Sequence, residues 1–170
     1  TVGALITMAA HLEGKGASVL DFVGFAQKFG PVLSYIRIAS EPAALNQVRI
    51  DDEQADALIG CDLVVSSSPK ASQTYGRGHT RVVLNTTEIA TADFVLHRDA
   101  NLKADQRINA IRDVVGDDNL STVSANRLAA AFLGDTIYSN VLMLGYAWQM
   151  SLIPVAENAL LRAIEINAVQ

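Results

Sequence analysis

The chain has 170 residues, a formal net charge of −5 and an apolar content of 50%. A chain of this length and composition can bury a sizeable core as one ordinary domain, which excludes an intrinsically disordered protein. The acidic balance argues against a nucleic-acid partner, and no apolar run approaches the roughly 18 residues that a membrane helix needs. The N-terminus lacks the order of a signal peptide, so we expect a cytoplasmic protein.

Metal and redox chemistry have little support in the sequence. Cys61 is the single cysteine, which excludes an internal disulfide, and an iron–sulfur cluster normally takes four cysteine thiolates. The three histidines are far apart, and none has a second histidine or a carboxylate at metal-ligand spacing. We therefore expect no metal site and no catalytic residue here, and we interpret Cys61 as a small buried side chain.

The chain opens with a helix followed by a strand. Apolar residues at helical spacing predict a helix over 2–12, which Gly14 and Gly16 stop ahead of a short strand over 18–22. A helix followed by a strand is the second half of a βαβ unit, so we expect another strand upstream of Thr1. We interpret the chain as a segment of a longer one.

A polar loop between two glycines, over 24–31, connects that strand to an alternating strand over 32–38. Loops at strand ends carry the chemistry of open α/β folds. Lys28 in this loop supplies a point charge for an anion, and Arg37 on the next strand adds to a polar, anion-facing surface. A solvated lysine that binds nothing is the alternative. The candidate ligand-binding residues in this part are Gln27, Lys28, Gly30 and Arg37.

The middle of the chain continues the alternation of helices and strands. We expect a strand over 47–50, then a helix that an aspartate cap at Asp51 opens toward Gly60, then a strand over 63–66. The next strand, over 81–85, is apolar on both faces, which is typical of a central parallel strand.

A serine turn, Ser66, Ser67 and Ser68, ends the predicted strand over 63–66. Hydroxyls and backbone N–H groups in such a turn can receive a phosphate or another anion, although serine turns are commonly only helix caps. The carboxyl ends of parallel strands lie at the same edge of a sheet. We therefore expect this turn and the loop over 24–31 to converge on one crevice.

The last third of the chain is predicted to be mainly helical. A long connection over 86–101, with an irregular strand around 94–96, leads to a helix over 105–115 and a strand over 120–124. Three helices follow, over 126–133, 137–150 and 154–168, the last with Pro154 in its first turn. The sequence thus predicts an α/β fold: an open, mostly parallel sheet flanked by helices, with a helical C-terminal third, in a single domain over 1–170.

Two glycines in the helical third have different interpretations. Gly134 can end one helix in a left-handed conformation, and Asp135 can cap the next. A glycine inside a helix costs about 1 kcal/mol relative to alanine, and it usually marks the close approach of another backbone. We therefore expect Gly145 to be a packing position or a subunit contact.

The loop and strand over 24–37 resemble the gamma domain of 2-oxoacid:ferredoxin oxidoreductases, and the indolepyruvate ferredoxin oxidoreductases are the most similar of these. The family loop usually has two glycines after its lysine, whereas Phe29 precedes Gly30 here. The family's glycine-rich turn before the first helix is also absent. Further similar segments follow in order along the chain, at 60–65, 85–86, 134–149, 153–154 and 163–167.

The resemblance implies the gamma domain of a thiamine diphosphate-dependent enzyme. Such an enzyme decarboxylates a 2-oxoacid, here indolepyruvate or another arylpyruvate, forms an acyl-CoA from coenzyme A and passes two electrons to ferredoxin. Thiamine diphosphate, magnesium and the iron–sulfur clusters are then expected on partner domains or subunits.

The resemblance further implies that this non-redox domain helps to form the coenzyme A and active-site region, and we expect Asn140 and Gly145 at a subunit contact. Two alternatives remain, a stand-alone nucleotide- or CoA-binding module and a purely structural assembly subunit.

Overall fold

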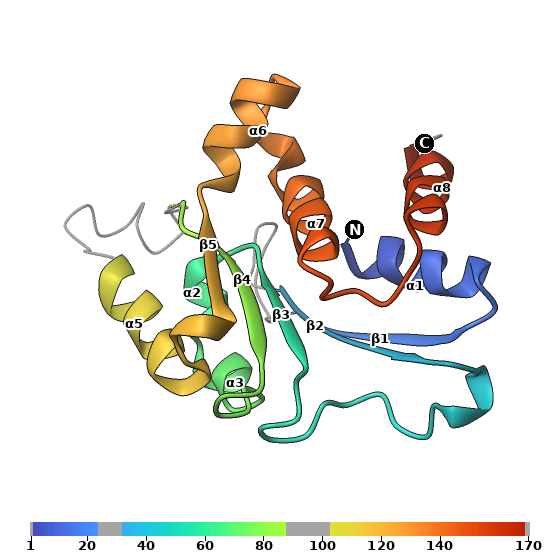
Figure 1. The fold of residues 1–170 in the computed structure, drawn as a ribbon, viewed down its shortest axis with the longest axis horizontal. Helices are drawn as coiled ribbons and strands as arrows, with labels where there is room; N and C mark the ends of the chain where they lie inside the picture. Colours follow the sequence, from blue (N-terminus) through green and yellow to red (C-terminus); the bar gives the residue numbers. More distant parts are fainter. Residues whose placement is uncertain (1, 24–31, 88–102, 169–170) are drawn as a thin grey trace. The chain divides into compact units, whose positions relative to one another are not determined.

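The computed structural model of the protein describes residues 2–23, 32–87 and 103–168 (Figure 1). These residues belong to two compact units. The first takes its residues from the segments 1–23, 32–50 and 153–170, and the second from 24–31 and 51–152.

The first unit is an antiparallel strand pair with two helices. Strands β1 (Gly16–Val23) and β2 (Val32–Ala39) pair along their whole length. Helix α1 (Val2–Leu12) packs on this pair and on α8 (Glu157–Ala168), and the 3-10 helix η1 (Pro42–Ala44) follows β2. A side chain at Gly3 would lie 3.1 Å from Val19 Cγ2, so glycine lets α1 approach the strands closely. The predicted helix over 2–12 and the strands over 18–22 and 32–38 are confirmed.

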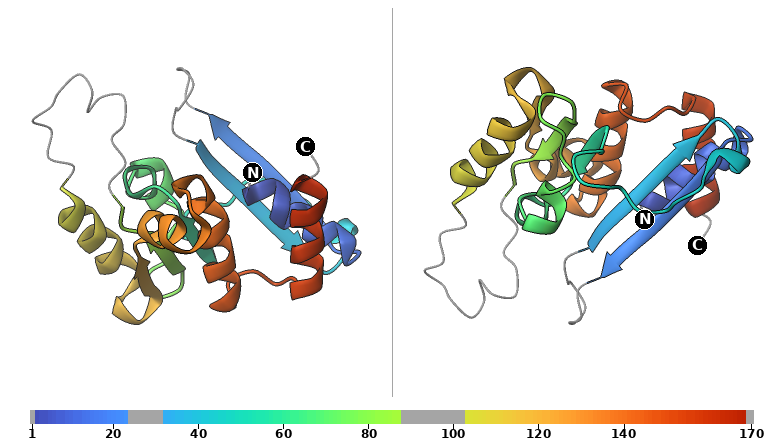
Figure 2. Two further views of the ribbon diagram at one scale, coloured as in Figure 1. Left: turned by 90° about the horizontal axis from the view of Figure 1, so that it is seen from above. Right: turned by 90° about the horizontal axis from the view of Figure 1, so that it is seen from below.

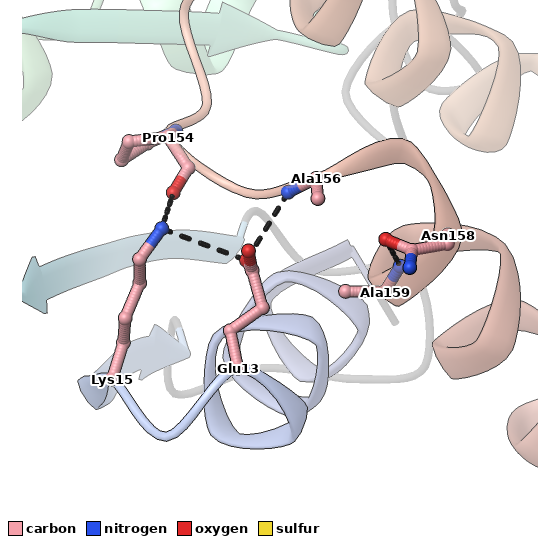
Figure 3. A network of polar contacts seen from close by, with 6 residues as sticks. All are labelled: Glu13, Lys15, Pro154, Ala156, Asn158 and Ala159. Carbon is pink, nitrogen blue, oxygen red and sulfur yellow. Dashed lines mark hydrogen bonds and ion pairs between the residues drawn. The ribbon is translucent and has the colours of Figure 1, made fainter.

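Polar contacts tie the end of α1 to the start of α8 (Figure 3). The Glu13 carboxylate accepts a hydrogen bond from the backbone N of Ala156 at 3.1 Å. Lys15 Nζ donates to the Pro154 carbonyl at 2.6 Å and lies 3.6 Å from Glu13 Oε2. Glu13 thereby satisfies an N–H group just ahead of α8, as a helix cap does. Since α8 begins only at Glu157, the expectation that Pro154 lies in its first turn is wrong.

The second unit contains a parallel sheet of three strands in the order β3, β4, β5. The strands are β3 (Ala57–Gly60), β4 (Arg81–Asn85) and β5 (Leu120–Val123). Val82, Val83 and Leu84 are fully buried in the central strand, as its apolar run predicts.

Helices cover this sheet. Helix α2 (Leu63–Ser66) contacts β3, α5 (Ala104–Val115) contacts β5, and α7 (Ser139–Gln149) packs on β3 and β4. Figures 1 and 2 show α5 and α7 on opposite sides of the strands. The remaining elements are α3 (Pro69–Ser72), η2 (Asp117–Asn119), α6 (Ala125–Leu133) and η3 (Thr136–Tyr138). The predicted fold class is confirmed: an α/β protein with a parallel sheet flanked by helices and helices toward the C-terminal end.

The predicted helix from Asp51 toward Gly60 is wrong. A single turn forms, with the Gln54 N–H donating to the Asp51 carbonyl at 3.2 Å, and then Glu53 adopts a left-handed φ of +60° that no helix continues through. The next residues form β3 because β4 offers them a parallel partner, which local propensity cannot reveal. The predicted strand over 47–50 is also wrong, since these residues form no strand.

The predicted strand over 63–66 is a one-turn helix instead. The Asp62 side chain accepts a hydrogen bond from the Val65 N–H at 2.9 Å and so caps α2. This cap outweighs the β propensity of the valines, and β3 already occupies the position in the sheet. The predicted helices over 105–115, 126–133 and 137–150 and the strand over 120–124 are confirmed within a few residues. The irregular strand predicted around 94–96 lies outside the described residues.

Candidate functional site

The carboxyl ends of the three parallel strands meet at one edge of the sheet, where open α/β folds bind their ligands. Asn85, at the end of β4, organises this edge and is only 1% exposed. Its Nδ2 donates to the Cys61 carbonyl at 3.2 Å and to Asn126 Oδ1 at 2.9 Å. Its Oδ1 accepts from the N–H groups of Thr87 at 3.1 Å and Ala125 at 3.0 Å. One amide side chain therefore fixes the chain that follows each of the three strands.

Two threonines follow β4 at the same edge. Thr86 Oγ1 donates to the Val123 carbonyl at 3.4 Å. Thr87 Oγ1 is buried and has no hydrogen-bond partner in the described part of the chain. Buried hydroxyls nearly always have a partner in native proteins, so Thr87 Oγ1 is a candidate contact for a ligand or for a partner that completes the site.

The three predicted serines run from the last residue of α2 to the N-cap of α3, and each of their hydroxyls makes a local hydrogen bond. Ser66 Oγ donates to the Asp62 carbonyl at 2.6 Å, and Ser68 Oγ accepts from the first turn of α3 at 3.4 Å. Ser67 Oγ donates to the Val64 carbonyl at 3.1 Å and also accepts from Arg107 Nη1 at 2.8 Å. The bond from α5 places a guanidinium beside the turn. Sequence reasoning missed Arg107, because only the fold brings it next to a residue forty positions earlier.

The serine turn and the loop over 24–31 were expected to converge because both would follow the carboxyl ends of parallel strands, and this expectation about the strands is wrong. The turn follows helix α2 and not a strand, and β1 and β2, which flank the loop, form an antiparallel pair and not part of the parallel sheet. Gln27, Lys28 and Gly30 lie outside the described residues. The convergence of the two loops stays a prediction without that support.

Arg37 lies in the first unit, on one face of the strand pair. Its Nη1 donates to the Arg49 carbonyl at 2.9 Å. The Arg49 guanidinium lies 5.9 Å from the ring centroid of Phe22, and that ring meets Tyr35 edge-on at 4.8 Å. Ser18, the cross-strand partner of Arg37, has a buried Oγ that finds no hydrogen-bond partner among the residues that the structure describes. The Arg37 guanidinium thus lies beside the Arg49 backbone, and guanidinium groups are the usual donors for an anion.

Cys61 is free, and its chemistry is that of a protected thiol. Burial, with a smaller effect of the neighbouring Asp62 carboxylate, raises the pKa of Cys61 to about 11. The thiolate is the reactive form, so little of it exists at neutral pH. Elsewhere in the described ranges, no group of three or more His, Cys, Asp or Glu residues could hold a metal ion. None of the helices described is both long enough and apolar enough to cross a membrane.

The two predicted contact residues, Asn140 and Gly145, lie on α7 and are both exposed. A side chain at Gly145 would meet no atom within 4 Å. Gly145 therefore meets no close neighbour among the described residues, and its role as a subunit contact stays a prediction.

A protein-family model described as pyruvate ferredoxin/flavodoxin oxidoreductase matches residues 1–168. The match runs through both compact units. No curated protein matches the chain.

Proposed function

The chain belongs to the pyruvate ferredoxin/flavodoxin oxidoreductase family, and on that premise we propose that it is the gamma domain of a 2-oxoacid:ferredoxin oxidoreductase. The observation that carries the proposal is the family match across nearly the whole chain. The complete enzyme converts a 2-oxoacid, coenzyme A and two oxidised ferredoxins into an acyl-CoA, carbon dioxide, two reduced ferredoxins and a proton. Residues 1–170 act as one gamma domain in this proposal, with both compact units inside it.

The oxidation itself takes place on partner domains or subunits. Thiamine diphosphate with magnesium supplies the decarboxylation chemistry there, and iron–sulfur clusters carry the electrons. The cysteine content of this chain supports the placement of the clusters on partner domains or subunits, since one cysteine cannot supply the four thiolates of an iron–sulfur cluster.

This domain contributes cationic and hydroxyl groups to the coenzyme A and active-site region. Coenzyme A carries phosphates, and arginine binds phosphate oxygens in a bidentate manner. The Arg37 guanidinium beside Arg49 and the Arg107 guanidinium beside Ser67 support this role. Ser66, Ser67 and Ser68 all use their hydroxyls in local bonds, and Ser67 is the stronger candidate because it also contacts the Arg107 guanidinium. From the sequence, Gln27, Lys28 and Gly30 complete the proposed set.

The substrate proposed from the resemblance is indolepyruvate or another arylpyruvate. The test is an assay of the complete purified enzyme with indolepyruvate, pyruvate and 2-oxoglutarate, each with coenzyme A and ferredoxin. We expect ferredoxin reduction and acyl-CoA formation in a two-to-one ratio, with the highest kcat/KM for indolepyruvate. A higher kcat/KM for pyruvate would overturn the substrate class alone. The absence of turnover with all three oxoacids would overturn the oxidoreductase proposal.

A further inference from the structure

The segment 130–138, which we call the α6–η3 surface, exposes a cluster of large apolar side chains. It covers the end of α6, the turn after it and η3, and every residue in it is exposed. Phe132 is 78% exposed, Leu133 51%, Ile137 75% and Tyr138 49%. Single exposed apolar residues are common on proteins, but four within seven positions form a patch.

This patch is held in a fixed conformation. Gly134 ends α6 with a left-handed φ of +81°, and Asp135 Oδ1 then accepts a hydrogen bond from the Ile137 N–H at 2.9 Å. Helix α6 packs on η3 and α7, and Figure 1 shows it extending beyond the ends of β4 and β5. The local sequence therefore builds a rigid turn that keeps the apolar side chains directed away from the core.

The exposed area fits a protein partner. An aromatic side chain presents about 150–250 Å², so the four residues together expose about 500 Å² of mainly apolar surface. This equals the largest patch of a typical monomer, and such patches commonly mark interaction sites. It is also more than half of the roughly 800 Å² that each partner contributes to a standard protein interface.

Charge distinguishes between a second copy of this chain and a different partner. Asp135 is the only charged residue from 128 to 156, and it is exposed in the middle of the patch. In a two-fold dimer the same patch is buried on both subunits, so two Asp135 carboxylates would lie in one mainly apolar interface. The net charge of −5 adds to the repulsion between two copies. A partner with an apolar face and a lysine or arginine opposite Asp135 would replace this carboxylate repulsion by attraction.

We propose that the α6–η3 surface docks this domain onto another domain or subunit of the same oxidoreductase, through an apolar face that carries a positive charge opposite Asp135. The inference rests on the proposed function, because that function supplies the partner. Exposed Asn140 is the second residue of α7 and lies two positions after the end of η3, so the predicted subunit contact is next to this surface in the chain.

The first test places a photoreactive group on the surface of the complete enzyme. In the variant Ile137→p-benzoylphenylalanine, irradiation and peptide mapping identify what lies next to η3. We expect crosslinks to peptides of the enzyme outside residues 1–170. Crosslinks to segment 130–138 of a second copy, or no crosslink at all, would overturn the proposal.

Three further substitutions in the crosslinking background separate apolar docking from charge. Phe132→Asp should lower the crosslink yield at least about thirtyfold, the loss expected of an interface hot spot. Asp135→Asn keeps a good helix cap but removes the negative charge, so we expect the crosslink yield to fall by a smaller factor, about tenfold. Leu161→Asp is the matched control, because Leu161 is 53% exposed and lies on α8. An equal loss in this control would contradict a local docking surface.

Oxoacid turnover of the unmodified enzyme separates this inference from the proposed function. Turnover without a crosslink would refute the docking surface and leave the function intact. A crosslink to another part of the enzyme without oxoacid turnover would refute the oxidoreductase proposal and leave the surface as an interface.

Discussion

Replacing Asn85 by alanine should destabilise the carboxyl edge of the parallel sheet by about 4 kcal/mol. The side chain makes four hydrogen bonds at 2.9–3.2 Å, and each contributes about 1 kcal/mol net to stability. The bond from the Ala125 N–H is buried, so that donor loses its partner away from water. A loss of this size is a large share of the roughly 5–15 kcal/mol that stabilises an ordinary domain.

Native-state hydrogen exchange of the complete protein measures this effect, through the opening free energies of peptides that cover β4, β5 and the start of α6. Asn126→Ala should cost about 1 kcal/mol, and the double variant should show a coupling energy of similar size because the two amides share a bond. Asn109→Ala is the matched control, since Asn109 is exposed on α5 and should change stability by less than about 0.5 kcal/mol. A loss below about 1 kcal/mol in Asn85→Ala, or no coupling with Asn126, would refute the reasoning.

Three further predictions concern protein chemistry, packing and catalysis. Because the pKa of Cys61 is raised from 9.0 to about 11, iodoacetamide should label the folded protein at pH 8 about a hundredfold more slowly than the unfolded chain, and equal rates would contradict its protection. The folded state keeps a proton between pH 9 and 11 that the unfolded chain releases, so urea unfolding should show stability falling across that range, whereas a flat profile would argue against the shift. Gly16→Ala should lower the free energy of unfolding by about 1–3 kcal/mol, because the new Cβ would lie 2.7 Å from the Glu41 carbonyl oxygen. Gly145→Ala should raise it by up to about 1 kcal/mol, because the new Cβ meets no described atom within 4 Å. Urea unfolding that gave the reverse order would be inconsistent with this packing. Lys28→Met in the complete enzyme should raise the KM of coenzyme A or of the oxoacid about tenfold with an unchanged Tm, and steady-state kinetics with both constants unchanged would assign the lysine to a solvated loop.

The long periodic segments of this protein could be predicted from the sequence. Helices α1, α5 and α7 each repeat an apolar face over three turns, so local spacing alone specifies them. The run Val82 to Leu84 is apolar on both faces, and only a central parallel strand buries a run of this kind on both sides. The left-handed end of α6 at Gly134 and the cap at Asp135 were also predictable, since both depend on neighbours in the chain.

The short segments between 47 and 66 were predicted wrongly, because pairing with distant residues decides β3 and because the Asp62 cap outweighs the β propensity of the valines in α2. Four residues become β3 only where β4 lies alongside, and a single cap at Asp62 turns the next valines into a helix. The candidate site follows the same rule. Its residue types were visible in the sequence, but the bond from Asn85 to Cys61 spans 24 residues, and those from Asn85 to Ala125 and from Arg107 to Ser67 span 40. Local chemistry determined which elements form, and tertiary packing decided which side chains meet, since those contacts exist only in the folded chain.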